Sequence, residues 1–179
     1  RGAGGRSSNK KLKGNLSFDH GVQYISPKSK VFTKIIQKLS KKKILKTWDG
    51  NHLDFTFEKK TLNPKYIGVK ANNALSKYYL KNIKTSFSSQ IVKIEHKKYF
   101  WEIKLDNNAK HQFKALILTC PFPQLKKLAG RYLEKKVSNL KIQMQPNITV
   151  MVALTNKKEL PISSIKFDDN MLAWAANEN

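Results

Sequence analysis

The sequence opens with a glycine-rich basic stretch, Arg1-Gly2-Ala3-Gly4-Gly5-Arg6, and soon continues with Phe18-Asp19-His20-Gly21-Val22-Gln23-Tyr24. In the first stretch the glycines let the backbone approach a ligand closely. The two flanking guanidinium groups suit a diphosphate, and successive backbone N–H groups in such a loop can hold an anion. Taken alone, the stretch is equally typical of a flexible chain end.

The second stretch places a glycine inside a segment that otherwise has strand character. Such a glycine marks a bulge, or a point where a ligand or another backbone comes close. Asp19, His20, Gln23 and Tyr24 add polar groups on either side of Gly21. By itself this pattern is also compatible with ordinary strand packing.

Together, the two stretches resemble the FAD-dependent amine-oxidase superfamily, and within it the bacterial renalase-like group. In that family a segment with a glycine doublet follows the second strand of an FAD-binding Rossmann unit. An Asp-x-Gly-x-Gln-Tyr strand then passes beside the flavin. The order and spacing of both stretches agree with this arrangement. Looser similarity continues in residues 89–94, 115–124 and 172–177.

The chain also departs from the family pattern. Gly68-Val69-Lys70-Ala71-Asn72 stands where the family usually has Gly-x-Pro-Gly-Met. The chain contains no Gly-x-Gly-x-x-Gly motif, and that element would lie upstream of Arg1. We therefore expect an internal fragment that lacks the start of the Rossmann unit and is inactive alone.

The resemblance implies roles for two groups of residues. Those expected to bind FAD, without a covalent link, are Arg1, Gly4, Gly5, Arg6, Gly21, Ile91, Cys120 and Pro121. Those expected on the substrate side are Gln23, Tyr24 and Trp174. No catalytic acid/base pair is identified, because the flavin supplies the difficult chemistry and the protein orients it.

The activity implied is hydride transfer from an amine or a reduced nicotinamide-type substrate to the flavin, with reoxidation by oxygen. Two alternatives stay open. One is another FAD dehydrogenase with the glycine doublet, of the desaturase-like or protoporphyrinogen-oxidase-like kind. The other is a non-enzymatic basic module that binds nucleic acid, for which we would expect a steep salt dependence.

Composition bears on partners and compartment. The 179 residues carry a net charge of +23, but arginine occurs only at positions 1, 6 and 131. Because groove-reading proteins depend on the arginine fork, we expect no nucleic-acid partner. A single cysteine excludes an intrachain disulfide, which fits a reducing, cytoplasmic compartment. No apolar run reaches the roughly 20 residues of a membrane helix, and no ligand spacing suggests a metal site.

Hydrophobic patterning predicts a mixed α/β fold. Helical spacing indicates helices over 27–42, starting at Ser26-Pro27, over 73–80, and over 124–128. Strands are expected at 18–25, 44–48 and 52–57, the last two joined in a hairpin through Asp49-Gly50. A β-meander is expected over 87–94, 99–105 and 113–119, and later strands over 148–154, 165–167 and 172–175.

The resemblance implies that these elements form a partial two-domain FAD-binding architecture. The FAD domain would be discontinuous, built from 1–26 and 66–130. The substrate domain, with an antiparallel sheet, would take 27–65 and 131–179. We expect Trp48, Tyr78 and Tyr79 in the core, and His52 in solvent.

Overall fold

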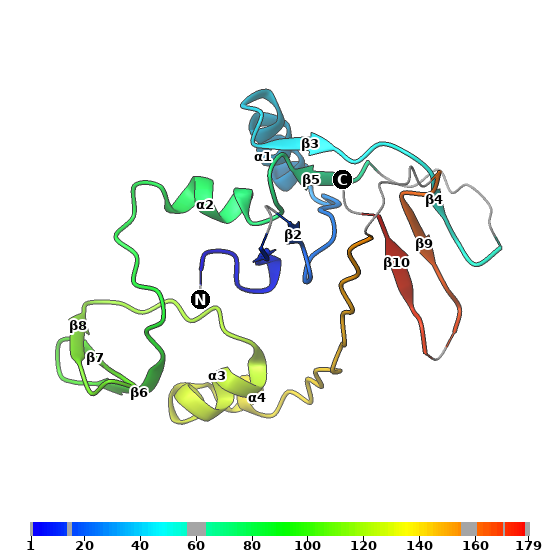
Figure 1. Ribbon diagram of the computed structural model, residues 1–179. Coiled ribbons are helices and arrows are strands. Elements are labelled where there is room, and N and C mark those ends of the chain that lie inside the picture. The colour runs from blue at the N-terminus through cyan, green and yellow to red at the C-terminus, as the bar shows by residue number, and fades with distance from the viewer. Residues whose placement is uncertain (1, 14–15, 57–63, 155–160, 170, 178–179) are drawn as a thin grey trace. The chain divides into compact units, whose positions relative to one another are not determined.

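The computed structural model describes residues 2–13, 16–56, 64–154, 161–169 and 171–177. The chain forms two compact units (Figure 1). Unit 1 comprises Arg1–Thr85 and Thr149–Asn179, and unit 2 comprises Ser86–Ile148. The fold is mixed α/β, as predicted, with helices and small, mainly antiparallel sheets.

Unit 1 contains two helices and several short strands. In chain order its elements are η1 (Gly5–Ser7), β1 (Lys10–Lys11), β2 (Ser17–Phe18), α1 (Lys30–Lys41), β3 (Leu45–Thr47), β4 (His52–Leu53), β5 (Tyr66–Gly68), α2 (Ala74–Leu80), β9 (Ser164–Lys166) and β10 (Trp174–Ala176). β1 pairs with β2 and β3 with β5, both antiparallel. β9 lies between β10, which is antiparallel to it, and β4, which is parallel.

The core of unit 1 forms where α1 packs against β3. Ile36 and Leu39 of α1 are buried together with Leu45 of β3. The helix begins after Ser29, whose hydroxyl accepts a hydrogen bond from the Phe32 N–H at 3.2 Å. The predicted start at Ser26-Pro27 is therefore wrong by about one turn, because the capping hydroxyl comes from the later serine.

The second helix, α2, confirms the prediction for residues 73–80. Tyr78 packs on the unit 1 core, as expected. Tyr79 does not, since 51% of it is exposed. Its ring instead meets the Tyr78 ring edge-on at 5.3 Å between centroids.

The hairpin predicted through Asp49-Gly50 is wrong. The two strands on either side of this turn pair with distant partners, β3 with β5 and β4 with β9. The strand predicted over 52–57 is limited to β4 within the described residues, and beyond it Asp54 is buried and Phe55 is exposed. The Asp54 carboxylate closes a local turn by accepting from the N–H of Thr56 at 3.0 Å. Such a turn competes with strand extension. Phe57 lies outside the described residues.

The strand predicted over 18–25 is mostly not a strand. It is limited to β2 and an isolated bridge between Ile25 and Tyr66. Between them, the carbonyls of Val22 and Gln23 both accept hydrogen bonds from the Asn72 side chain. A side chain therefore takes the place of a partner strand.

Unit 2 is built on a three-stranded meander, whose first two strands were predicted and whose third lies earlier in the chain than expected. Its elements are β6 (Ile91–His96), β7 (Trp101–Leu105), β8 (Lys110–Phe113), α3 (Phe122–Ala129), η2 (Gly130–Tyr132) and α4 (Lys135–Ser138). The strands pair in the order β6-β7-β8, all antiparallel. Ile94, Ile103, Leu105 and Ala129 form its buried core. α3 confirms the helix expected at 124–128 and begins two residues earlier.

Two predicted strands do not form. β8 ends at Phe113, and in residues 114–119 only Leu116 and Leu118 pack on the core while Ile117 is 91% exposed. Residues 148–154 form no strand, and Ile148 and Val152 are exposed. Apolar character alone does not make a strand, because the backbone also needs a partner edge to bond with.

None of the described helices has the length and apolar character that a membrane crossing requires.

Candidate functional site

Aromatic side chains gather around Trp48 in unit 1. The Trp48 ring lies 5.8 Å from the ring of Tyr24 and 6.2 Å from that of Trp174, measured between centroids. The ring of His52 meets it edge-on at 4.6 Å. Together with Lys65, these residues form what we call the Trp48 cluster. Tyr24 and Trp174, both expected on the substrate side, thus meet on one tryptophan.

Lys65 is the buried cation of this cluster. Its Nζ lies 4.7 Å from the Tyr24 ring centroid and 5.7 Å from that of Trp48. The β3–β5 register positions it, because Trp48 N–H donates to the Lys65 carbonyl at 2.8 Å. Only 8% of Lys65 is exposed, and burial lowers the pKa of its ammonium group. The aromatic faces act in the opposite direction, since they favour the charged form.

His52 is fixed at both ring nitrogens. Nε2 lies 2.9 Å from the Trp48 carbonyl oxygen, and Nδ1 lies 2.8 Å from Oγ of Ser164. Because a carbonyl only accepts, Nε2 carries the proton, and in the neutral ring Nδ1 accepts from the serine hydroxyl. Our expectation that His52 is solvated is wrong, because the ring of this β4 residue bonds to Trp48, just after β3, and to Ser164 of β9. Ser164 is buried, so this pair serves as a structural link.

A buried asparagine connects the two opening stretches to the rest of unit 1. The Asn72 side chain donates to the carbonyls of Val22 and Gln23, each at 2.8 Å, and accepts from Gly68 N–H at 2.9 Å. Its own N–H donates to Asp19 at 2.9 Å. The same Asp19 carboxylate accepts from the Asn9 amide at 3.1 Å. Asn72 is therefore the residue that fixes the 18–23 segment.

The glycine loop folds against this segment. Gly4 has a φ of 112° and Gly5 a φ of 51°, both in the left-handed region that favours glycine. Gly21 is needed for a different reason, because a Cβ there would lie 1.9 Å from the carbonyl oxygen of Arg6. That carbonyl accepts from Val22 N–H at 2.9 Å. The close approach expected at Gly21 is thus made by the backbone of the loop.

Two buried polar atoms beside the loop have no hydrogen-bond partner in the part of the chain that is described. They are Nδ1 of His20 and Oδ1 of Asn73. Asn73 approaches Gly4, where a Cβ would lie 2.9 Å from its own Cβ. The other nitrogen of His20 lies 3.5 Å from the Ser8 hydroxyl. A bound hydroxyl group would donate to Oδ1 of Asn73, and a hydroxyl or phosphate oxygen would accept from Nδ1 of His20 in the tautomer that carries its proton there.

The remaining expected site residues are distributed as follows. Arg1 lies outside the described residues, and the Arg6 side chain is exposed. Gln23 is half-buried. Ile91, Cys120 and Pro121 belong to unit 2. There Ile91 packs on the core and the Pro121 carbonyl accepts from Leu125 N–H, at the start of α3.

Sequence reasoning did not identify Lys65 or Asn72. Asn72 was noted only as a departure from a family motif. Lys65 lies one residue before a short strand and carries no local signal, because its burial depends on β3 pairing with β5. No protein-family model matches the chain, and a search of curated proteins finds no match.

Proposed function

We propose that this chain is part of an FAD-dependent oxidoreductase of the amine-oxidase type, and that the Trp48 cluster receives the planar ring of the substrate. The observation that carries this proposal is the convergence of Tyr24 and Trp174 on Trp48. These two residues come from opposite ends of the chain. Aromatic faces assembled in this way suit a planar ligand, since ring pairs gain energy beyond area burial.

The residues beside the glycine loop fit the cofactor. Asn73 Oδ1 and His20 Nδ1 lack partners among the described residues. Asn73 Oδ1 would accept from a ribityl hydroxyl, and His20 Nδ1 would donate to a ribityl or phosphate oxygen in the tautomer that carries its proton there. The left-handed backbone at Gly4 and Gly5 and the exposed Arg6 guanidinium suit the diphosphate. In this proposal Gly21 holds the glycine loop in place by allowing the Arg6 carbonyl to approach closely. Other residues contact the flavin ring.

FAD, when bound, would supply the hydride acceptor and would be reoxidised by oxygen. The chain's own contribution is to bind the substrate ring and exclude water from it. Lys65 also discriminates between the two substrate classes. Its ammonium group lies over the Tyr24 and Trp48 rings and would repel a protonated amine at close range. We therefore favour a reduced nicotinamide-type substrate, whose reacting ring is neutral.

The test begins with a visible absorption spectrum of the purified parent protein, expressed from the reading frame extended in both directions. Flavin bands should persist through gel filtration. Replacing Trp48 with alanine should lower kcat/KM for a reduced nicotinamide substrate by about tenfold or more, equivalent to about 1.4 kcal/mol. The matched control is Tyr99→Ala in unit 2, an aromatic that is 77% exposed. It should change kcat/KM less than twofold, roughly.

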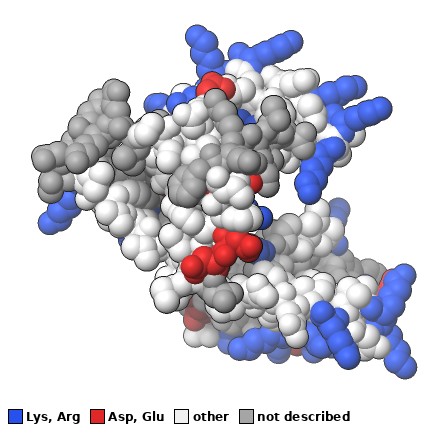
Figure 2. All heavy atoms as spheres, turned by 90° about the vertical axis from the view of Figure 1, so that its right-hand side faces the viewer, with Lys and Arg blue, Asp and Glu red and all other residues white. Residues whose placement is uncertain are grey.

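A colourless, well-folded protein that fails to take up added FAD would contradict the proposal. A basic module that binds nucleic acid would then be the leading hypothesis for the function. Exposed lysines lie on elements of both units, and all described lysines are exposed except Lys65 and Lys104. Figure 2 shows exposed basic side chains on separate parts of the chain. A nucleic-acid groove would instead concentrate them along one face.

A further inference from the structure

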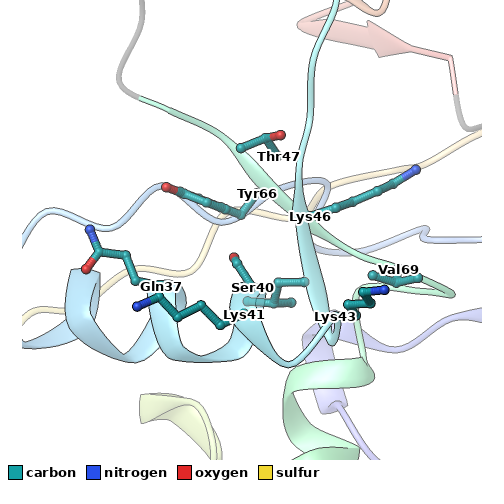
Figure 3. A pocket seen from close by; sticks show the side chains of 9 residues that line it. Gln37, Ser40, Lys41, Lys43, Lys46, Thr47, Tyr66 and Val69 are labelled. Atoms are coloured by element: carbon teal, nitrogen blue, oxygen red, sulfur yellow. The ribbon is translucent and has the colours of Figure 1, made fainter.

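Lys65 differs from the other lysines of unit 1 in its surroundings. It is 8% exposed, whereas every other lysine described in this unit is exposed. Lys41, Lys43 and Lys46 line an open hollow beside the C-terminal end of α1, and their side chains point to different sides in Figure 3. That arrangement keeps each of these ammonium groups in water. The ammonium group of Lys65 lies instead among the rings of the Trp48 cluster.

This buried ammonium group has no anionic partner within the described ranges. Two carboxylates of the same part of the chain are bonded elsewhere. Asp49 accepts from the Thr47 hydroxyl at 3.0 Å, and Asp54 accepts from the Thr56 N–H at 3.0 Å. Aromatic faces attract the charge, but a buried charge stays costly unless it is also paired and hydrogen-bonded. The three N–H donors of Lys65 are therefore available to a ligand.

The ammonium group can still be reached from solvent. Three polar atoms of the described residues are both enclosed and without a hydrogen bond, and Nζ of Lys65 is not one of them. Since Nζ has no hydrogen bond there either, it keeps some exposed surface. The rings of Tyr24, Trp48 and Trp174 are half-buried, so part of each ring is open as well. A ligand can therefore touch both a ring and the cation.

The position of Nζ limits where the ligand carries its negative charge. Nζ lies 4.7 Å from the centroid of the Tyr24 ring and 5.7 Å from that of Trp48. Aromatic rings pair with their centroids about 4.5–7 Å apart, so a ligand ring on this cluster would lie beside the ammonium group. A carboxylate attached to that ring, or one carbon away, could then bond to Nζ at about 2.7–2.9 Å. A phosphate separated from the ring by a ribose fits less well, because it lies several bonds further away.

We propose that Lys65 binds a carboxylate carried by the substrate ring that lies against Trp48. The ligand of the cluster is thus a planar aromatic or heteroaromatic carboxylate, and Lys65 determines specificity for it. Within the reduced nicotinamide type, Lys65 selects the ring acid over the ring amide. This inference rests on the proposed function, since it takes the ligand of the Trp48 cluster to be the substrate.

Tryptophan fluorescence of the full chain tests the inference, because two of its three tryptophans, Trp48 and Trp174, belong to the cluster. Nicotinate and nicotinamide are matched probes, since they share one ring and differ in a carboxylate against a carboxamide. At about 0.15 M salt, which screens the distant lysines, nicotinate should bind about tenfold more tightly than nicotinamide. The cationic 3-(aminomethyl)pyridine should bind more weakly than both. No binding of nicotinate, or equal affinities for the three probes, would overturn the proposal.

Lys65→Met removes the charge and keeps an apolar side chain in its place. It should reduce the preference for nicotinate to less than about twofold. Retained nicotinamide binding in this variant would show that the cluster still folds. The matched control is Lys34→Met, which removes the same charge from an exposed position of α1 and should keep the preference. A preference that survives in Lys65→Met, or that both variants lose equally, would refute a role for Lys65.

These results are independent of the flavin spectrum of the parent protein. Flavin bands without a preference for nicotinate would refute the role of Lys65 and leave the oxidoreductase proposal intact. A preference for nicotinate that depends on Lys65, in a parent protein that takes up no FAD, would support the carboxylate site and contradict only the oxidoreductase activity.

Discussion

The two units bury different chemistry. The buried residues of unit 2 are all apolar, namely Ile94, Ile103, Leu105 and Ala129. Unit 1 has an apolar core as well, but it also buries Asp54, Lys65, Asn72, Asn73 and Ser164. Because a buried polar group is costly unless it is bonded, unit 1 depends on hydrogen bonds to groups such as Asp54, Asn72 and Ser164, which unit 2 does not need. The Trp48 cluster and the glycine loop both belong to unit 1.

The units also differ in how far apart in sequence their partners lie. The strands of unit 2 pair with their neighbours along the chain. In unit 1, β4 pairs with β9 and Asn72 bonds to Val22 and Gln23, so distant segments must meet first. Closing such long loops costs entropy. Unit 1 therefore depends on a few specific contacts, and removing them should cause the largest losses in the free energy of unfolding.

The largest effect should follow from Asn72→Ala. The change leaves the Val22 and Gln23 carbonyls and the Gly68 N–H without their partner. We expect a loss of about 4 kcal/mol in the free energy of unfolding, since each buried group left unsatisfied costs about 1–3 kcal/mol. Urea denaturation measures the loss, and hydrogen exchange should show lowered protection in unit 1.

Asn107→Ala is the control for that change. Asn107 also bonds through its side chain to the backbone, accepting from Ala109 N–H at 3.0 Å, but in an exposed turn of unit 2. It should cost less than about 1 kcal/mol. If both variants lose the same stability, burial of the polar group is not what distinguishes the units.

A somewhat smaller effect is expected from Ile94→Ala in unit 2. Ile94 is 2% exposed and packs with Ile103 and Leu105. Its truncation should cost about 3 kcal/mol through lost burial and the cavity left behind. Val92→Ala on the same strand, where the side chain is 50% exposed, should cost less than about 1 kcal/mol. Hydrogen exchange should place the loss in β6 and β7. If protection from hydrogen exchange were lost only in unit 1, the two units would not differ in the way described above.

The same difference explains what could be predicted from sequence. The β6–β7 pair was predicted because Trp101, Ile103 and Leu105 alternate beside a neighbouring strand. The helices α1 and α2 were predicted because their apolar periodicity is local. The Asp49-Gly50 hairpin failed because a turn signal says nothing about competing partners, and β5 and β9 outcompeted the adjacent strand. Residues 148–154 also show that a local pattern does not reveal the pairing partner. Their branched apolar residues recur at every second position, but without a partner edge they form no strand.

For the candidate site, the sequence placed Tyr24 and Trp174 on the substrate side, and this stays a prediction. The structure brings the rings of both next to Trp48, at 5.8 and 6.2 Å between centroids. Trp48 was assigned only to the core, and Lys65 was not considered. Burial of a lysine follows from the packing of rings that are far away in sequence, so no local pattern could indicate it.

A third test concerns the buried charge itself. Burial lowers the pKa of Lys65 below its ordinary value of 10.5, so the unfolded chain binds this proton more tightly. The protein should therefore gain stability as the pH rises from the lowered pKa toward 10.5, and Lys65→Met should show no such gain. Urea midpoints at pH 7 and pH 10 measure this, with Lys34→Met as the exposed control. Equal slopes in the protein and in Lys65→Met would show that Lys65 carries no burial cost.

The smallest effect belongs to the surface charges of unit 2. Hydrogen bonds from Lys93 and then Lys97 lower the pKa of Glu95 to about 2, and their Nζ atoms lie 2.9 and 3.2 Å from its carboxylate oxygens. A lowered carboxyl pKa gives stability that is full above the ordinary value of 4.5 and is lost as the pH falls toward 2. Glu95→Gln should lack this acid dependence, which a carbon NMR titration and acid unfolding would measure. Glu134→Gln, whose side chain is 73% exposed, should keep it. Because solvent screens such pairs, the change should be small, and a loss as large as that of Asn72→Ala would mean that unit 2 too depends on its charges.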